Sequence, residues 1–105
     1  MALTRNVKET VRARMARDPG FRQALLEEGI ERLLAGEVDL GKAVLRDYVN
    51  ATIGFQELGD LTAKSPKSLM RMLGPDGNPQ ARHLFKIISC LQEREGLELK
   101  VHALR

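Results

Sequence analysis

The segment that decides the fold is residues 55–73, FQELGDLTAKSPKSLMRML, which reads as two short helices joined by a tight turn. Its apolar residues recur at helical spacing over 55–63 and again over 66–73. Between the two runs, Ser65 and Pro66 form a helix start signal, because a serine side chain caps free N–H groups and proline suits the first helical position. The segment therefore predicts a helix-turn-helix.

The two predicted helices have an inner and an outer face. The inner face comprises Phe55, Leu58, Leu61, Thr62, Leu69 and either Met72 or Leu73. Gly59 and Ala63 supply small side chains where the helices must cross closely. The outer face of the second helix comprises Pro66, Lys67, Ser68, Met70 and Arg71. In a helix-turn-helix this second helix enters the major groove of duplex DNA, so these outer residues are candidate DNA contacts.

Each candidate contact has a plainer alternative. Arg71 suits a bidentate contact to guanine and Lys67 a guanine or a phosphate, but both also suit a solvated helix face. Ser65 is first of all a helix cap. The other candidate phosphate contacts are exposed polar residues in either case, and they are Gln56, Lys64 and Asn78.

Similar start and stop signals divide the rest of the chain. Helices are expected over 4–16, 19–35 (started by Asp18 and ended by Gly36), 39–54 (started by Asp39) and 84–96, with a loop at 74–79. Residues 97–101 alternate apolar and polar, which predicts a strand. A lone strand must lie against the body or pair with a second chain, and pairing across a two-fold axis is the simpler arrangement.

The expected fold is thus all-α, with an N-terminal helical extension at 1–38 and a helix-turn-helix domain at 39–105 that ends in a short dimerisation strand. The role of the extension stays open. Its second helix either covers the body, forms the dimer interface or binds a protein partner. Its first helix, which carries Arg5, Lys8, Arg12, Arg14 and Arg17, either follows the DNA backbone or is a solvated arm.

The composition excludes several classes of protein. The chain has 105 residues, of which 43% are hydrophobic and 30% charged, and no apolar run approaches the roughly 20 residues of a membrane span. The single cysteine, Cys90, forms no internal disulfide, so a cytoplasmic protein is expected. His83, Cys90 and His102 show neither metal-ligand spacing nor a catalytic arrangement. We therefore expect no enzyme, no metal and no cofactor.

The charges are segregated along the sequence. Residues 1–22 carry a balance of +4, residues 23–60 of −5 and residues 61–105 of +4. No acidic residue occurs between Leu61 and Gly74, where Lys64, Lys67 and Arg71 lie. A basic patch at the second predicted helix is the footprint expected of a polyanionic partner.

The residues 55–62 and 66–79, with the loop LGPDGNP at 73–79 and the apolar helix at 84–88, resemble bacterial addiction-module antidote proteins of the lambda-repressor-like, Xre-type helix-turn-helix superfamily. The resemblance covers about residues 40–101. It implies a dimer that binds duplex DNA and regulates transcription as a repressor. The alternative that it implies is an antitoxin that sequesters a RelE-like toxin and autoregulates its operon. The chain departs from the family at Gly59, where alanine is usual, at Ala63, where glycine is usual, and at Lys64, where an apolar residue is usual.

Overall fold

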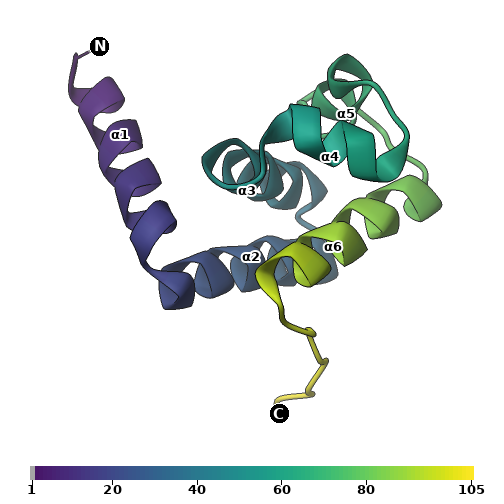
Figure 1. The fold of residues 1–105 in the computed structure, drawn as a ribbon. Helices are drawn as coiled ribbons and strands as arrows, with labels where there is room; N and C mark the ends of the chain where they lie inside the picture. Colours follow the sequence, from purple (N-terminus) through teal and green to yellow (C-terminus); the bar gives the residue numbers. More distant parts are fainter. Residues whose placement is uncertain (1) are drawn as a thin grey trace.

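The computed structural model describes residues 2–105, with side chains from Thr10 onward, and contains six helices in this range. The helices are α1 (Ala2–Arg17), α2 (Pro19–Leu34), α3 (Val38–Ala51), α4 (Gly54–Thr62), α5 (Pro66–Met72) and α6 (Ala81–Glu95). As Figure 1 shows, α2 and α3 lie side by side, α4 to α6 close the other side, and α1 projects from the body. The all-α class is therefore confirmed.

The helix starts that rest on a capping residue followed by proline are confirmed. Asp18 accepts a hydrogen bond from the Phe21 N–H at 3.1 Å, and Pro19 begins α2. This hydrogen bond also lowers the pKa of the Asp18 carboxyl. At the other end of α2, Gly36 takes a positive φ of 83°, which suits glycine because it has no Cβ.

The predicted boundaries of the 39–54 helix are wrong at both ends. The helix begins at Val38, before Asp39, and the N-cap position is held by Glu37, which makes no side-chain capping bond. Asp39 instead lies 3.5 Å from the Lys42 ammonium. Gly54, predicted to end this helix, has a φ of 80° and begins α4.

Two glycines allow α2 and α3 to pack closely. A Cβ on Gly41 would lie 2.7 Å from the Leu33 side chain, and a Cβ on Gly29 would lie 3.1 Å from Leu45. Leu26 of α2 is fully buried, so α2 is part of the main core. Of the three roles left open for this helix, covering the body is therefore one that it fulfils.

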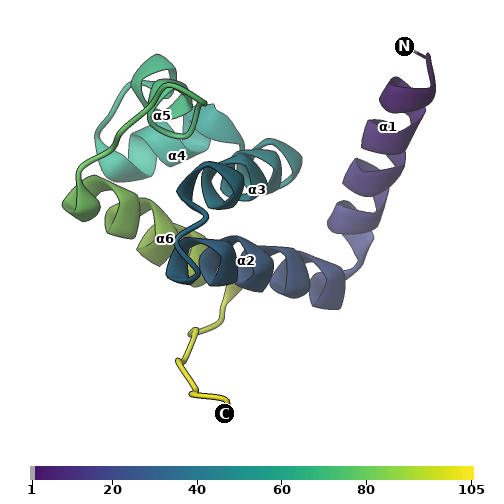
Figure 2. The same cartoon turned by 180° about the vertical axis from the view of Figure 1, so that it is seen from behind.

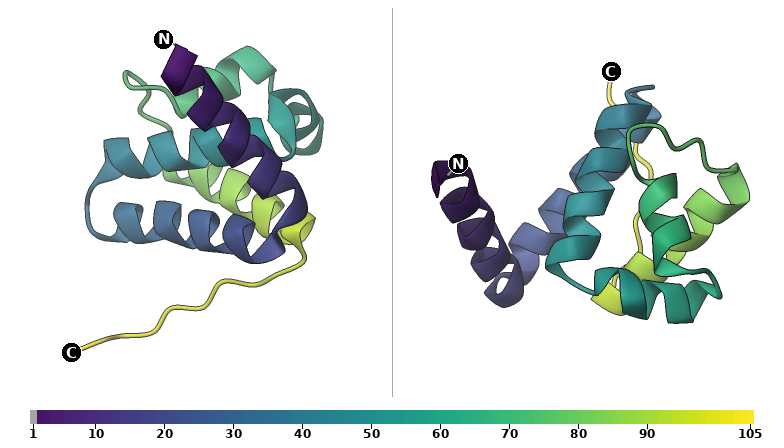
Figure 3. Two further views of the ribbon diagram at one scale, coloured as in Figure 1. Left: turned by 90° about the vertical axis from the view of Figure 1, so that its left-hand side faces the viewer. Right: turned by 90° about the horizontal axis from the view of Figure 1, so that it is seen from above.

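The core is aliphatic, as the scarcity of aromatic residues requires. Its fully buried side chains come from all six helices and the turn after α5, and they are Met15, Leu26, Leu45, Val49, Leu58, Leu69, Leu73 and Leu91. Met15 is the anchor of α1, whose other described side chains are exposed. Figure 2, from behind, and the right panel of Figure 3, from above, show how far α1 stands from the other helices.

The predicted strand at 97–101 does not form in the described chain. After Gly96, which ends α6 at a φ of 74°, the backbone runs extended beside α2 and has no second strand to pair with (Figure 3, left). Among the described residues no helix is long and apolar enough to cross a membrane.

Candidate nucleic-acid interface

Helix α5 presents one face to the core and the other to solvent. Its start is fixed by Ser65, whose Oγ accepts a hydrogen bond from the Ser68 N–H at 3.1 Å. Leu69, together with Leu73 just after the helix, is fully buried. The cap predicted for Ser65 and the inward orientation predicted for Leu69 are both confirmed. Leu61 of α4 was expected inward as well, but it is 51% exposed, so that expectation is wrong.

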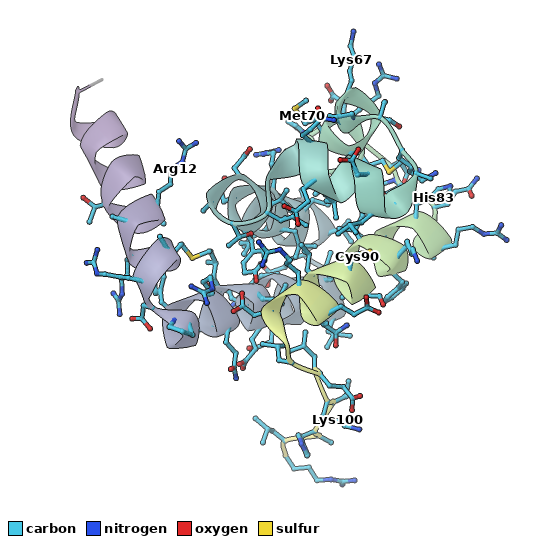
Figure 4. All side chains as sticks on the ribbon, viewed as in Figure 1. Arg12, Lys67, Met70, His83, Cys90 and Lys100 are labelled. Atoms are coloured by element: carbon cyan, nitrogen blue, oxygen red, sulfur yellow. The ribbon has the colours of Figure 1, made fainter. Side chains whose placement is uncertain are left out.

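The outer face of α5 carries cations that have no partner within the chain. Lys67 and Arg71 are exposed, and Lys64, in the turn before the helix, is half-buried. Among the described residues, none of the three makes an ion pair or a side-chain hydrogen bond. Figure 4 shows Lys67 pointing straight away from the body, with Met70 beside it. The face therefore offers free positive charge to an external anion.

The other candidate contacts lie on this face or on separate elements. Pro66 and Ser68 are half-buried members of α5, and Met70 is 47% exposed. Gln56 is exposed in the first turn of α4, and Asn78 is exposed in the loop between α5 and α6. The five residues predicted for the outer face thus share one helix, whereas Gln56 and Asn78 come from neighbouring elements.

The turn between α4 and α5 is tight and strained at one residue. Ala63 has a φ of 57° and a ψ of 39°, a left-handed conformation that L residues other than glycine rarely adopt. The Lys64 N–H donates to the Gly59 carbonyl at 3.1 Å, which closes the end of α4. A Cβ on Gly59 would lie 2.6 Å from the Lys64 carbonyl oxygen, so only glycine fits there.

Two cations of α3 hold the far end of α5 from behind. The Lys42 side chain is almost fully buried, and its ammonium donates to the carbonyls of Gly74, at 3.1 Å, and Gly77. Arg46, one turn later in α3, donates to the Leu73 carbonyl at 3.0 Å. The acceptors are carbonyls of the helix cap Leu73 and of the loop that follows it. Lys42 and Arg46 therefore fix the position of α5 and of the loop that follows it.

The sequence-based predictions did not include these contacts of Lys42 and Arg46. The available signal was a lysine at a position that the apolar stripe of α3 occupies, since Lys42 stands three residues before the fully buried Leu45. A lysine at such a position must either reach solvent or find buried acceptors. The loop carbonyls that it finds come from residues 32 and 35 positions later, which local pattern does not reveal.

A second polar cluster lies where α1, α2, α3 and α6 approach one another. Glu95 accepts from the Arg22 guanidinium at 3.0 Å and from the Tyr48 hydroxyl at 2.6 Å, and Arg22 also donates to the Met15 carbonyl at 2.7 Å. Burial and the neighbouring Glu95 raise the pKa of Tyr48, so its phenol stays protonated. Because these groups satisfy one another, the cluster joins α1 to the body.

The cysteine and the two histidines lie apart from this cluster. Cys90 is buried, and within the described residues no group of three potential ligands is placed to hold a metal ion. His83 lies on α6, whereas His102 lies in the extended segment beyond it. Comparison with family models, with curated proteins and with solved structures gives no match. The function is therefore inferred from the residues of this chain.

Proposed function

We propose that this protein is a sequence-specific DNA-binding transcriptional regulator, a homodimeric repressor, in which α4 and α5 act as a helix-turn-helix of the lambda-repressor-like type. One observation carries the proposal. Helix α5 is anchored by Leu69 and Leu73 and clamped from behind by Lys42, while Lys67 and Arg71 on its outer face have no partner among the described residues.

The chemistry of this face suits duplex DNA. Arg71 and Lys67 are four residues apart and therefore share one side of the helix. A guanidinium forms two parallel hydrogen bonds with the O6 and N7 atoms of guanine, and an ammonium binds either a guanine or a phosphate. Met70, beside them, adds apolar surface that suits the methyl group of thymine. The DNA-contacting set that we propose comprises Gln56, Lys64, Ser65, Pro66, Lys67, Ser68, Met70, Arg71 and Asn78.

The projecting helix α1 supports a second, less specific contact. Its free half and α5 lie toward the same end of the molecule, opposite to the extended segment after α6 (Figure 1). Arg12 is exposed on α1, and Figure 4 shows it on the inner side of that helix. Arg5 and Lys8 belong to the same basic helix, but their side chains lie outside those that the structure describes. We propose that this helix contacts phosphates next to the site that α5 reads.

A gel-shift titration tests the proposal. The probes are the duplex directly upstream of the gene for this chain and a random duplex of equal length, each at several salt concentrations. The wild type should prefer its own duplex, and Arg71→Ala should lower the affinity by about 5- to 150-fold, the equivalent of losing one bidentate base contact. Lys67→Ala should weaken both probes equally and lower the salt slope by about one if it binds phosphate.

A matched control removes the same charge elsewhere. Arg32 lies on α2 and pairs with Glu37 at 3.3 Å. Arg32→Ala should therefore leave the preference between the two probes unchanged. If the wild type shows no salt-sensitive preference for its own duplex, the proposed function is wrong.

The second candidate function is that of an antitoxin that captures a basic toxin protein, with DNA binding used for autoregulation. The observation that favours it is a group of exposed acidic and apolar side chains on α2 and at the start of α3. Glu28 and Glu31 are exposed there, and so are Leu34, at 68%, Val38, at 49%, and Leu40, at 48%. Exposed apolar residues bordered by charge of one sign are typical of a protein-binding surface.

Co-expression with the adjacent gene decides between the two candidates. The antitoxin function predicts that the neighbouring frame encodes a short basic protein, that the two proteins purify as a stable complex, and that Leu34→Arg weakens the complex. If the protein encoded by the adjacent gene does not bind this chain, or is not basic, the antitoxin function is excluded. The regulator function then remains.

A further inference from the structure

The segment of residues 97–102, which we call the edge segment, has an unpaired backbone. It leaves the end of α6 in an extended conformation (Figure 1) and begins its course next to α2 (Figure 3, left). The Leu97 N–H donates to the Gln92 carbonyl at 3.1 Å, and within the described chain no backbone–backbone hydrogen bond involves a later residue. Extended backbone with free N–H and carbonyl groups is a template for pairing with another strand.

Burial along the edge segment alternates as it does in a strand with one covered face. Leu97 and Leu99 are half-buried and pack against the core, whereas Glu98 and Lys100 are exposed. The alternation continues in sequence to Val101, but that side chain is 82% exposed. The apolar face of the segment is therefore covered at its start and bare at its end.

One hydrogen bond shows which edge of the segment is free. The Leu99 N–H donates to the Gln92 side-chain oxygen at 2.8 Å, so the polar backbone groups of Leu99 point toward α6 of the same chain. In extended backbone, successive residues direct these groups to opposite edges. Glu98 and Lys100 therefore direct theirs to the edge away from α6, where the chain offers no partner.

We propose that this free edge pairs with the same segment of a second copy of the chain, in a two-stranded antiparallel ribbon centred on Leu99. A pairing of identical segments across a two-fold axis is self-complementary. Side chains directly opposite each other in such a ribbon lie on the same face. The two-fold axis can pass either through one residue or between two neighbouring residues. In the second case the apolar side chains of one copy lie opposite the charged side chains of the other, so both faces of the ribbon mix apolar and charged groups. We exclude these registers for that reason.

Charge selects the centre among the remaining registers. A ribbon centred on Glu98 places this carboxylate opposite its own copy, and one centred on Lys100 does the same with two ammonium groups. A ribbon centred on Leu99 places each Glu98 opposite Lys100 of the second copy, so both cross-strand pairs attract. Like charges directly opposite each other destabilise a ribbon, whereas opposite charges stabilise it.

The same register covers the bare apolar side chain. It places Val101 opposite Leu97 of the second copy, on the face that already packs against the core. The apolar surface continues into a groove of about 250 Å³ between the edge segment and α2, where Ile30 and Leu34 belong to the lining. The second copy therefore meets apolar surface on one face of the ribbon and complementary charge on the other.

A charge-swap experiment on the whole chain tests the register. Sedimentation equilibrium should show that the wild type dimerises. Glu98→Lys and Lys100→Glu, each measured alone, place like charges at both cross-strand pairs, so the dissociation constant should rise roughly tenfold. An equimolar mixture of the two variants should recover wild-type association, because every cross-strand pair in the heterodimer is again of opposite sign.

The mixture separates this interface from an effect within one chain. Glu98 and Lys100 are 2.8 Å apart in the same segment, and each variant loses that contact whether it is alone or mixed. If the mixture recovers wild-type association, the recovery must therefore come from the charge pairs between the two copies. A wild type that stays monomeric, or a dimer that neither variant weakens, overturns the proposal.

Disulfide trapping tests directly whether the ribbon is centred on Leu99. Leu99 faces its own copy in a pair without backbone hydrogen bonds, where the two Cα atoms are about 4.5 Å apart and within disulfide reach. In a Cys90→Ala background, Leu99→Cys should form a covalent dimer on oxidation. Cross-linking at Glu98→Cys or Lys100→Cys in place of Leu99→Cys overturns the register. The ribbon rests on the homodimer of the proposed function, but these measurements use no DNA, so a failure of the ribbon is distinguishable from a failure of DNA binding.

Discussion

The strained residue in the turn between α4 and α5 leads to a prediction whose sign is unusual. Ala63 has a φ of 57°, and a left-handed conformation costs an L residue with a Cβ about 1–2 kcal/mol. Ala63→Gly removes this cost. Glycine also raises the conformational entropy of the unfolded chain, and this stabilises the unfolded state by about 0.4–1 kcal/mol and so offsets part of the gain. We therefore expect Ala63→Gly to raise the free energy of unfolding by about 0.5–1 kcal/mol.

Thermal and denaturant unfolding measure this change. A gain of this size corresponds to an increase in Tm of roughly 2–6 °C for a domain of about 100 residues. The slope of the free energy of unfolding against urea concentration should stay unchanged. The matched control is Ala24→Gly, the same chemical change at an exposed position inside the regular helix α2. This control should lower the stability by about 1 kcal/mol. If both variants lose stability, the turn is not strained at Ala63 and the reasoning fails.

Three further predictions concern the same framework. Gly59→Ala should destabilise the protein despite the higher helix propensity of alanine, because its Cβ would lie 2.6 Å from the Lys64 carbonyl oxygen; an unchanged Tm would contradict this close approach. Lys42→Met should lower the stability by about 1–3 kcal/mol, since it removes the ammonium donor from the Gly77 carbonyl and one of the two donors from the Gly74 carbonyl, and hydrogen exchange should quicken first in the loop 74–79. The pKa of Asp18 should lie below its ordinary value of 3.8 in a carbon-detected NMR titration. Because this folded-state pKa is lowered, the contribution of Asp18 to stability should be complete above about pH 4 and disappear as the pH falls through the lowered pKa; Asp18→Asn should remove that dependence.

The parts of the fold that sequence predicts well are those that local chemistry determines. Ser65 with Pro66 and Asp18 with Pro19 each define a helix start within a few residues, and the structure has both. The 39–54 helix shows the limit of such signals. Asp39 resembles an N-cap, but in the folded chain its carboxylate lies near the buried Lys42 instead. A side-chain contact within the first turns of α3 has thus replaced the predicted capping bond.

The candidate site also has one part that local sequence predicts and one part that it does not. The outer face of α5 is predictable because Lys67 and Arg71 stand out of phase with Leu69 and Leu73, and helical periodicity alone places them outside. The contacts that hold α5 in place are not predictable locally. Arg46 reaches the Leu73 carbonyl over 27 positions of sequence, and that distance is bridged only once the helices have packed.

The rigid support behind α5 bears on how specific its binding can be. A helix of seven residues is marginal on its own, so its outer side chains are oriented only as well as its attachment to the body allows. Leu69 and Leu73 fix its inner face, and Lys42 and Arg46 fix the cap and the loop that follow its last turn. A cation carried on such a fixed helix loses less conformational entropy on binding than one carried on a mobile loop. For Arg71 this preorganisation favours discrimination between bases over simple attraction to phosphate, because two parallel hydrogen bonds to guanine require a defined orientation that a phosphate does not.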